Sequence, residues 1–234
     1  MPQTPVILFE DNHIIVCVKP AGIASQSARS FQPDMTDLLR THIAAGTCKG
    51  NIPYIGVVHR LDQPVGGVMV YAKDPAAAAA LSRQTAARTM SKNYYAVLCG
   101  AMTPTEGTLT DYLLKDGRTN TSAVVLPPTA PGGDIKKASL SYRITDVRTI
   151  DGGTFSLADV ALDTGRHHQI RVQFSHAGFP IFGDSKYNTS YPGNNGCSAL
   201  GLFAYSLSFK HPVTHRLMDF KFLPRYEPFT WFGL

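Results

Sequence analysis

The residues best suited to chemistry lie in one short stretch, His59-Arg60-Leu61-Asp62, which a Pro/Gly-rich run and then an apolar segment follow. This pattern predicts that Asp62 lies on a loop at a strand end, where a rigid scaffold commonly presents reactive groups. A neighbouring Arg favours the ionised form of an Asp and can bind it through two hydrogen bonds. A charged carboxylate of this kind can act as a nucleophile or a base. The same residue types also describe a structural ion pair, and taken alone they favour that interpretation.

Two further places could contribute chemistry. The segment Thr164–Arg171 carries two Arg and two His residues, and Tyr94 lies in an apolar, aromatic-rich segment. The sequence contains no P-loop, no GxGxxG or GxSxG motif, and no His spacing typical of zinc ligands. A glycosidase with two carboxylates stays open, because its partner residues can be distant in the sequence.

The elements that must position these residues are predicted from hydrophobic patterns and helix caps. Asp34 is expected to cap a helix over Met35–Ala45, and Asp74 a helix that starts at Pro75 and runs to about Arg88. Strand patterns cover Val6–Glu10, Ile14–Val18, Val68–Ala72, Lys92–Ala101, Thr108–Leu114, Ser122–Leu126, Ser139–Val147, Thr154–Leu162, Leu202–Phe209 and Leu217–Phe222. About nine or ten strands, mostly antiparallel neighbours, with three main helices predict an α+β fold.

The third helix is predicted to follow the Thr164–Arg171 segment and to end near Ala177, with Gly178 as the residue after its C-cap. Ile170, Phe174 and Ala177 lie at i, i+4 and i+7 and form one apolar face. Arg171 falls on a different, polar face. The helix can therefore pack on the core while its Arg171 side chain points elsewhere.

Composition sets further bounds. The 234 residues, 44% of them hydrophobic, suit one large domain or two small ones. Pro127–Gly133 could be a linker between two domains, but strand patterns resume on both sides and favour a surface loop within one domain. The four Cys residues are scattered singly, which indicates buried small side chains and not disulfides or zinc ligands.

The sequence shows no sign of a membrane or export signal. No apolar run approaches the roughly 20 residues that cross a bilayer, and the N-terminus lacks signal-peptide features. We therefore expect a cytoplasmic protein. Lys and Arg total 22 against 17 Asp and Glu, and the net charge of +5 weakly supports a polyanionic partner.

Several motifs, in one order along the chain, resemble those of the RluA-type pseudouridine synthase family. The Asp62 stretch with Gly67 is similar to the family's HRLDxxTSG, and Gly165 to Val172 is similar to its GRTHQIRVH. Further matches are Lys19-Pro20-Ala21-Gly22 to KPxG, Lys92-Asn93-Tyr94-Tyr95-Ala96 to KxYxA, Gly178 to Asp184 to GHPIxGD, and Leu202-Phe203-Ala204 with His211-Pro212 to LHAxxLxFxHP. The resemblance runs from about residue 9 to residue 223, and HRLD together with GRxHQIR is a specific signal.

The resemblance implies a single pseudouridine synthase catalytic domain over residues 1–234. Its expected architecture is a central mixed, mostly antiparallel sheet flanked by helices and loops, with an active-site cleft across the sheet. The implied reaction isomerises uridine in structured RNA to pseudouridine, moving the glycosidic bond from N1 to C5 without a cofactor or a metal. The expected substrate is ribosomal or transfer RNA, and the expected state is a monomer.

The resemblance also implies roles for individual residues. Asp62 matches the family's essential aspartate, which attacks or assists at the ribose. Tyr94 matches a tyrosine that stacks on the target base and helps to remove the C5 proton. Arg171 matches the arginine that pairs with the catalytic Asp and would keep Asp62 charged in a dry pocket. Arg60 matches a residue that fills the space left when the uridine flips out.

RNA must also be bound outside the reacting base. Many relatives carry an N-terminal S4 RNA-binding domain, but the residues before Phe9 cannot hold one, so we expect the catalytic domain itself to bind RNA. The basic candidates are Lys136, Lys137, Arg166, Lys186 and Arg216, each otherwise a solvated surface charge. His167, which replaces the family's usual Thr, is a further candidate for RNA contact. His59 is another, although we favour an orienting or packing role for it and for His168.

The chain departs from the family pattern at four positions. Val65 and Gly66 stand where the family usually has Thr and Ser, and Gln173 and Phe203 replace His residues. None of the four is a residue with an implied catalytic role, so we expect activity to survive. Two other functions stay open. One is an RNA-binding or RNA-folding protein whose catalytic role is lost or secondary, and the other is a hydrolase that releases free uracil.

Overall fold

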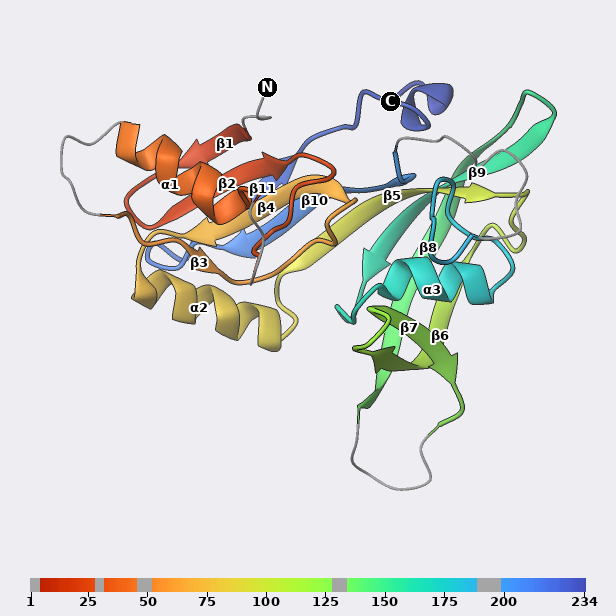
Figure 1. Ribbon diagram of the computed structural model, residues 1–234, viewed down its shortest axis with the longest axis horizontal. Coiled ribbons are helices and arrows are strands. Elements are labelled where there is room, and N and C mark those ends of the chain that lie inside the picture. Colours follow the sequence, from red (N-terminus) through yellow and green to blue (C-terminus); the bar gives the residue numbers. More distant parts are fainter. Residues whose placement is uncertain (1–4, 28–31, 46–51, 128–133, 189–198) are drawn as a thin grey trace. The chain divides into compact units, whose positions relative to one another are not determined.

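The computed structural model describes residues 5–27, 32–45, 52–127, 134–188 and 199–234. Two compact units make up the chain, unit 1 with residues 1–92 and 204–223, and unit 2 with residues 93–203 and 224–234. Both contain strands and helices, as the predicted α+β class requires (Figure 1). In the described residues, no helix is long and apolar enough to span a bilayer.

The sheet of unit 1 has the strand order β1-β2-β4-β10, with β11 added to β10 and β3 to β4. Its strands are β1 (Val6–Glu10), β2 (Ile14–Lys19), β3 (Gly56–Val57), β4 (Gly66–Ala72), β10 (Leu202–Lys210) and β11 (Leu217–Lys221). Every residue of β2 and of β4 is buried. These two strands therefore lack the alternation of buried and exposed residues that marks a sheet with one wet face.

Two helices belong to unit 1, and both follow their predicted caps. Helix α1 is Met35–Ala45, and the Asp34 carboxylate accepts hydrogen bonds from the Thr36 and Asp37 backbone N–H groups. Helix α2 is Pro75–Ala86, and Asp74 caps it by accepting from the Ala77 N–H at 2.8 Å. Helix α2 packs on one face of the sheet through a hydrophobic cluster. The buried members of this cluster are Ile14, Val16, Val68, Val70, Ala72, Ala77, Leu81, Met90, Leu207 and Phe209.

The sheet of unit 2 has the strand order β5-β9-β8-β6-β7. Its strands are β5 (Ser91–Cys99), β6 (Glu106–Asp116), β7 (Thr121–Val125), β8 (Ile135–Ile150) and β9 (Gly153–Leu162), and all four neighbouring pairs are antiparallel. Strands β7 and β8 both pair with β6, so the two strands that flank the Pro127–Gly133 stretch lie in one sheet. Residues 128–133 of that stretch lie outside the described residues.

Helix α3 (Gln169–His176) lies against the β6–β7 end of this sheet (Figure 1). Its Val172 packs with Leu113 of β6 and Ala138 of β8 in a small core cluster. Helix α3 ends as predicted, with Ala177 as its C-cap and Gly178 in the left-handed region at φ 86°. A short 3₁₀ helix, η1 (Phe229–Phe232), was not predicted and adds the chain's single Trp to unit 2.

The free cysteines Cys17 and Cys99 are buried, which confirms the prediction for these two positions. Cys48 and Cys197 lie outside the described residues. In the described part of the chain, no group of His, Cys, Asp and Glu residues has the arrangement of a metal site.

Gly67 shows how closely β4 approaches β10. It has φ +142°, and a Cβ there would lie 2.3 Å from the Ala204 carbonyl oxygen and 2.5 Å from the Ala204 Cβ. The β2–β4 register places Gly67 opposite Lys19, the last residue of β2. Backbone strain at Gly67 would therefore reach the end of β2, where the Lys19 side chain supports the Asp62 loop.

We predict that Gly67→Ala lowers the free energy of unfolding by about 3 kcal/mol, because it combines backbone strain with a main-chain clash. Urea unfolding followed by far-UV circular dichroism measures the change. Gly117→Ala is the matched control, since a Cβ at Gly117 meets nothing within 4 Å. Equal effects of the two substitutions would contradict the steric explanation.

Candidate active site

Asp62 lies half-buried on the loop between β3 and β4, as predicted. The loop turns back on itself, because the Val65 N–H donates to the Asp62 carbonyl oxygen at 3.0 Å. Ser25 fixes the preceding residue twice: its Oγ donates to the Leu61 carbonyl at 2.9 Å and accepts from the Leu61 N–H at 3.0 Å. The backbone next to Asp62 is thus held by Ser25, a residue of unit 1 that is 36 positions from Leu61 in the sequence.

Lys19 holds the other side of the same loop. Its side chain is fully buried, and its Nζ donates to the carbonyl oxygens of Pro20, Ile23 and Gln63 at 2.5–3.1 Å. Three acceptors match the three N–H donors of an ammonium group. Burial lowers the pKa of Lys19 to about 7, while the negative charge of Asp62 acts in the opposite direction.

His59 and Arg60 differ sharply in exposure. The His59 ring is buried, and its Nε2 accepts a hydrogen bond from the Val70 N–H of β4 at 3.1 Å. Burial, with a smaller contribution from Lys92, lowers the pKa of His59 to about 3, so the ring is neutral. This geometry fits the orienting role that the sequence allowed for His59. Arg60 is exposed beside it, as contact with RNA requires.

Tyr94 and Arg171 belong to unit 2, whereas Asp62 belongs to unit 1. Tyr94 lies on β5 opposite Val160 of β9, and 6% of its surface is exposed. The pairing of Arg171 with Asp62 that the sequence suggests stays a prediction. Within unit 2, the surroundings of Arg171 are clear.

Arg171 is buried on α3 and forms an ion pair with Asp184 through two hydrogen bonds. Its Nε donates to Asp184 Oδ2 and its Nη2 to Asp184 Oδ1, both at 2.7 Å. The two side chains are only 4% and 0% exposed. The predicted polar face of α3 is therefore buried as well as its apolar face. Bidentate pairing fixes the plane of the guanidinium group. The directions of its other N–H donors are therefore also fixed.

The sequence alone does not indicate that Asp184 and Tyr187 surround Arg171. Asp184 Oδ1 also accepts from the Lys186 and Tyr187 N–H groups, which fixes the turn that follows. The Tyr187 ring then lies 5.2 Å from the Arg171 guanidinium carbon. Asp184 closes the GHPIxGD-like segment, so the motif marked the position, but nothing in the sequence showed its link to Arg171.

The Tyr187 hydroxyl joins this turn to the start of α3. It accepts from the Ser122 N–H at 2.7 Å and lies 2.8 Å from His168 Nδ1. The His167 and His168 rings stack with centroids 3.7 Å apart. His168 is the N-cap residue in the left-handed region at φ 53°, and its ring is buried. His168 therefore has the packing role that we favoured from the sequence.

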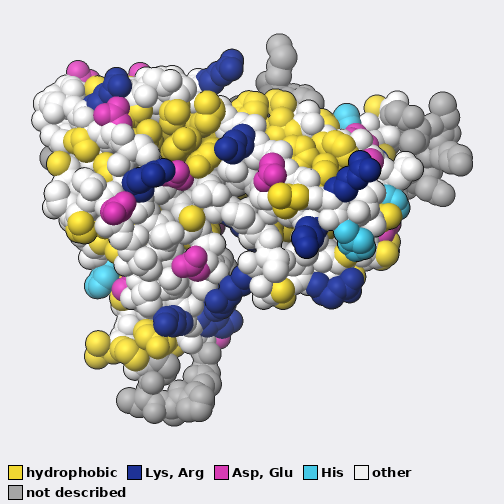
Figure 2. Space-filling view, turned by 180° about the vertical axis from the view of Figure 1, so that it is seen from behind, with side chains coloured by type: hydrophobic (Ala, Val, Ile, Leu, Met, Phe, Trp, Pro, Cys, Tyr) yellow, Lys and Arg dark blue, Asp and Glu magenta, His cyan; other side chains and the backbone are white. Residues whose placement is uncertain are grey.

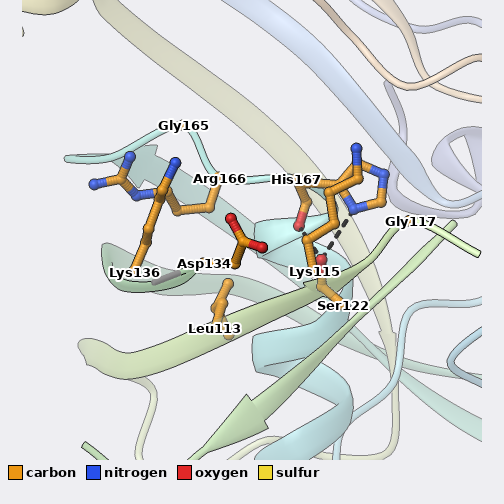
Figure 3. A pocket seen from close by; sticks show the side chains of 9 residues that line it. All are labelled: Leu113, Lys115, Gly117, Ser122, Asp134, Lys136, Gly165, Arg166 and His167. Carbon is orange, nitrogen blue, oxygen red and sulfur yellow. Dashed lines mark hydrogen bonds between the residues drawn. The ribbon is translucent and has the colours of Figure 1, made fainter. Parts of the chain in front are cut away.

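The other RNA-binding candidates lie at different places. Arg166 and His167 are half-buried in the loop before α3, and Lys136 and Lys137 are adjacent exposed residues of β8. The exposed Lys186 donates to the Asn120 carbonyl at 2.7 Å. Arg216 is exposed in unit 1. Lys136, Arg166 and His167 line one cavity of about 350 Å³, whereas Lys137 and Lys186 do not (Figure 3).

Three of the four departures from the family pattern have surroundings that the structure defines clearly. Val65 is buried in the turn of the Asp62 loop. Gln173 is buried on α3 and donates to Asp111 Oδ2 at 2.7 Å. The Phe203 ring packs edge-on against Tyr226 and Phe229.

Comparisons with known proteins agree with these observations. The family model described as RNA pseudouridylate synthase matches residues 13–176. The chain is 33% identical over 91% of its length to an uncharacterized RNA pseudouridine synthase of Bacillus subtilis, YhcT, and 35% identical over 77% to ribosomal large subunit pseudouridine synthase D of Pseudomonas aeruginosa. It spans 66% and 52% of the lengths of these two relatives.

A solved structure shows the same fold. Human RNA pseudouridylate synthase domain containing 1 superimposes with a TM-score of 0.76 at 20% identity, covering 94% of this chain and 83% of the human chain.

We predict that Lys19→Met lowers the free energy of unfolding by about 3 kcal/mol, because it leaves three carbonyl oxygens without their buried donor. Urea unfolding followed by far-UV circular dichroism measures it. Lys221→Met, at an exposed position on β11 of the same unit, is the control for loss of a charge. A loss no larger than that of the control would show that Lys19 does not support the loop.

We predict that Asp184→Asn destabilises unit 2 by about 3 kcal/mol, because a buried guanidinium loses its counter-charge. Asn keeps an oxygen for the backbone N–H donors, so the substitution tests the charge. The fluorescence of Trp231, which packs 5.1 Å from Phe155 and 4.9 Å from Phe182, reports unfolding of this unit. Asp151→Asn, at an exposed turn, is the matched control, and similar unfolding of both variants would refute the prediction.

Proposed function

The chain belongs to the RNA pseudouridylate synthase family, and on this premise we propose that it isomerises uridine in structured RNA to pseudouridine. The observation that carries the proposal is that the family match over residues 13–176 includes Asp62, Tyr94 and Arg171. The local structure supports it, because the backbone around Asp62 is fixed by Ser25 and Lys19. A reactive carboxylate gains from such support, since small misplacements of a catalytic group cost rate.

In the proposed reaction the target uridine leaves the RNA stack, because its glycosidic bond is inaccessible inside a duplex. Arg60, exposed on the Asp62 loop, takes the vacated space. Asp62 assists at the ribose while the bond between C1′ and N1 breaks. The uracil turns, a bond forms between C1′ and C5, the C5 proton leaves with help from Tyr94, and N1 takes up a proton. The atoms balance without a cofactor.

Arg171 has an electrostatic task in this proposal. A carboxylate in a dry site tends to take up a proton, and a fixed cation opposes that tendency. Asp184 supports the role, because it holds two of the guanidinium N–H groups and sets the direction of the rest. Arg171 and Asp62 belong to different units, so their pairing in the active site is part of the proposal.

We propose ribosomal RNA as the first substrate to test and transfer RNA as the second. The name of the Pseudomonas aeruginosa relative, a ribosomal large subunit pseudouridine synthase, favours this order. The proposal includes action as a monomeric single-domain catalyst in the cytoplasm, where both RNA classes are abundant.

We predict that the wild type releases tritium from RNA labelled at C5 of uridine, and that Asp62→Asn lowers the rate by roughly 10³-fold or more, because it removes the reacting carboxylate. Asp151→Asn, which removes an exposed carboxylate, should retain the wild-type rate. Mapping pseudouridines in RNA from a deletion strain then identifies the modified site.

Two outcomes separate the alternatives. Equal release by the wild type and Asp62→Asn, or none by the wild type on any cellular RNA, would favour an RNA-binding or RNA-folding protein. Free uracil as the product would indicate a hydrolase, which breaks the glycosidic bond without forming the new one.

A further inference from the structure

Strand register in unit 2 gathers charges on one face of its β6–β8 end. Lys115 of β6 lies directly opposite Ser122 of β7, and Leu113 of β6 lies directly opposite Lys136 of β8. Because side chains alternate along a strand, Leu113 and Lys115 share a face, and their opposite partners share it with them. Two ammonium groups from different strands therefore stand over the same patch of sheet.

The loop before α3 closes one side of this patch. The Ser122 hydroxyl donates to the His167 carbonyl and contacts His167 Nδ1, both at 2.9 Å. The Nε of Arg166 donates to the Lys137 carbonyl of β8 at 3.1 Å. These bonds fix a cavity of about 350 Å³, which we call the β6–β8 pocket. Its lining residues are Leu113, Lys115, Gly117, Ser122, Asp134, Lys136, Gly165, Arg166 and His167 (Figure 3).

The pocket has an excess of positive charge. Lys115, Lys136 and Arg166 are cations, and Asp134 is the one acidic residue in the lining. Among the residues that the structure describes, none of these three cations has a carboxylate within ion-pair distance. Figure 3 shows the Lys136 and Arg166 side chains next to each other, with Lys115 on the other side of Asp134. Figure 2 shows Lys and Arg side chains gathered at this end of unit 2.

Like charges gathered without acidic partners favour an anion in the site. Arg166 offers the planar donors that bind phosphate, and Lys136 adds a point charge beside them. The volume lies at the lower end of small-ligand pockets, roughly 300–1,000 Å³, and so suits a single nucleotide and not a helix. His167 forms a wall, because its Nδ1 lies against Ser122 and its Nε2 lies 3.1 Å from Asn120 Oδ1.

We propose that the β6–β8 pocket binds the sugar–phosphate backbone of an unpaired substrate RNA segment next to the target uridine. This inference rests on the proposed function for the identity of the polymer. Of the basic candidates named from the sequence, the proposal retains Lys136 and Arg166, and it adds Lys115. The negative charge of Asp134 opposes the binding of an RNA phosphate. Base flipping costs least in unpaired RNA, and a flipped-out base leaves its neighbours unpaired and their phosphates accessible.

Lys115→Gln and Lys136→Gln test the pocket, because neither side chain makes a hydrogen bond in the described residues and both variants should fold. Each should weaken RNA binding five- to tenfold at 0.1 M salt and reduce the slope of log K against log salt by about 0.7–1, the effect of one lost phosphate contact. In the tritium assay each should raise KM by a similar factor and leave kcat unchanged. Asp134→Asn should have the opposite effect and tighten binding.

Arg143→Gln is the matched control. It removes one exposed cation from β8 and lies an odd number of residues from Lys136, on the opposite face of the strand. Affinity and salt slope equal to this control in both Lys variants would overturn the proposal, as would weaker binding by Asp134→Asn. A pocket for free nucleotides would instead show competition by uridine monophosphate or inorganic phosphate below millimolar concentration, and that result would also overturn it.

The experiment separates this proposal from the proposed function. Tritium release by the wild type with unaltered KM in the Lys variants defeats the pocket alone. Absence of release by the wild type, with RNA binding that still depends on Lys115 and Lys136, defeats the reaction and retains the pocket as an RNA site.

Discussion

The buried ion pair between Arg171 and Asp184 is the constraint on which the functional face of unit 2 depends. Removing two charges from water is costly, and the cost is offset only when geometry and further hydrogen bonds are good. Here Asp184 accepts two hydrogen bonds from Arg171 and two more from the backbone of the turn that follows. The turn carries Tyr187, whose hydroxyl reaches Ser122 and His168. One carboxylate thus sets the helix, the turn and a wall of the β6–β8 pocket together.

Unit 1 also contains a buried charge, but it is stabilised in a different way. Lys19 is buried, and three backbone carbonyl oxygens accept hydrogen bonds from its ammonium group. Such an arrangement fixes main chain and leaves the orientation of the Asp62 side chain to its own contacts. The charge still acts on Asp62 at a distance, because the attraction between the two appears in the pKa of Lys19. Support of the loop and an electrostatic attraction to Asp62 are therefore two effects of one buried lysine.

Much of the fold could be predicted because it is encoded locally. Helix α1 has its predicted bounds and cap, and α3 ends at its predicted glycine. Strand β8 was predicted over Ser139–Val147 but extends over Ile135–Ile150. Lys136 and Lys137 interrupt the apolar pattern of its first residues, and pairing with β6 holds them in the strand, which a local pattern does not reveal. The two-residue β3 and the helix η1 were missed because they are too short to show periodicity.

The candidate site shows the same difference between features encoded locally and features that depend on long-range contacts. Asp62 was placed correctly on its loop because the surrounding turn and strand signals are local. The support from Lys19 joins positions 44 residues apart, and the motif resemblance that included both gave no hint of the contact. For His59 the sequence left two roles open, contact with RNA or orientation of neighbouring groups, and its burial and its hydrogen bond with Val70 fit the orienting role. The sequence shows which chemistry each side chain could perform, but burial in the folded structure decides which of these roles it can take.

The two kinds of cation in the β6–β8 pocket have different structural constraints. Arg166 is tied to the β8 backbone and lies in the loop that leads to Arg171, so a change there would disturb the surroundings of α3. Lys115 and Lys136 are set only by strand register, and their exposed side chains can change without altering a buried contact. RNA affinity and sequence context can therefore be tuned on the strands while the buried network around Arg171 stays constant.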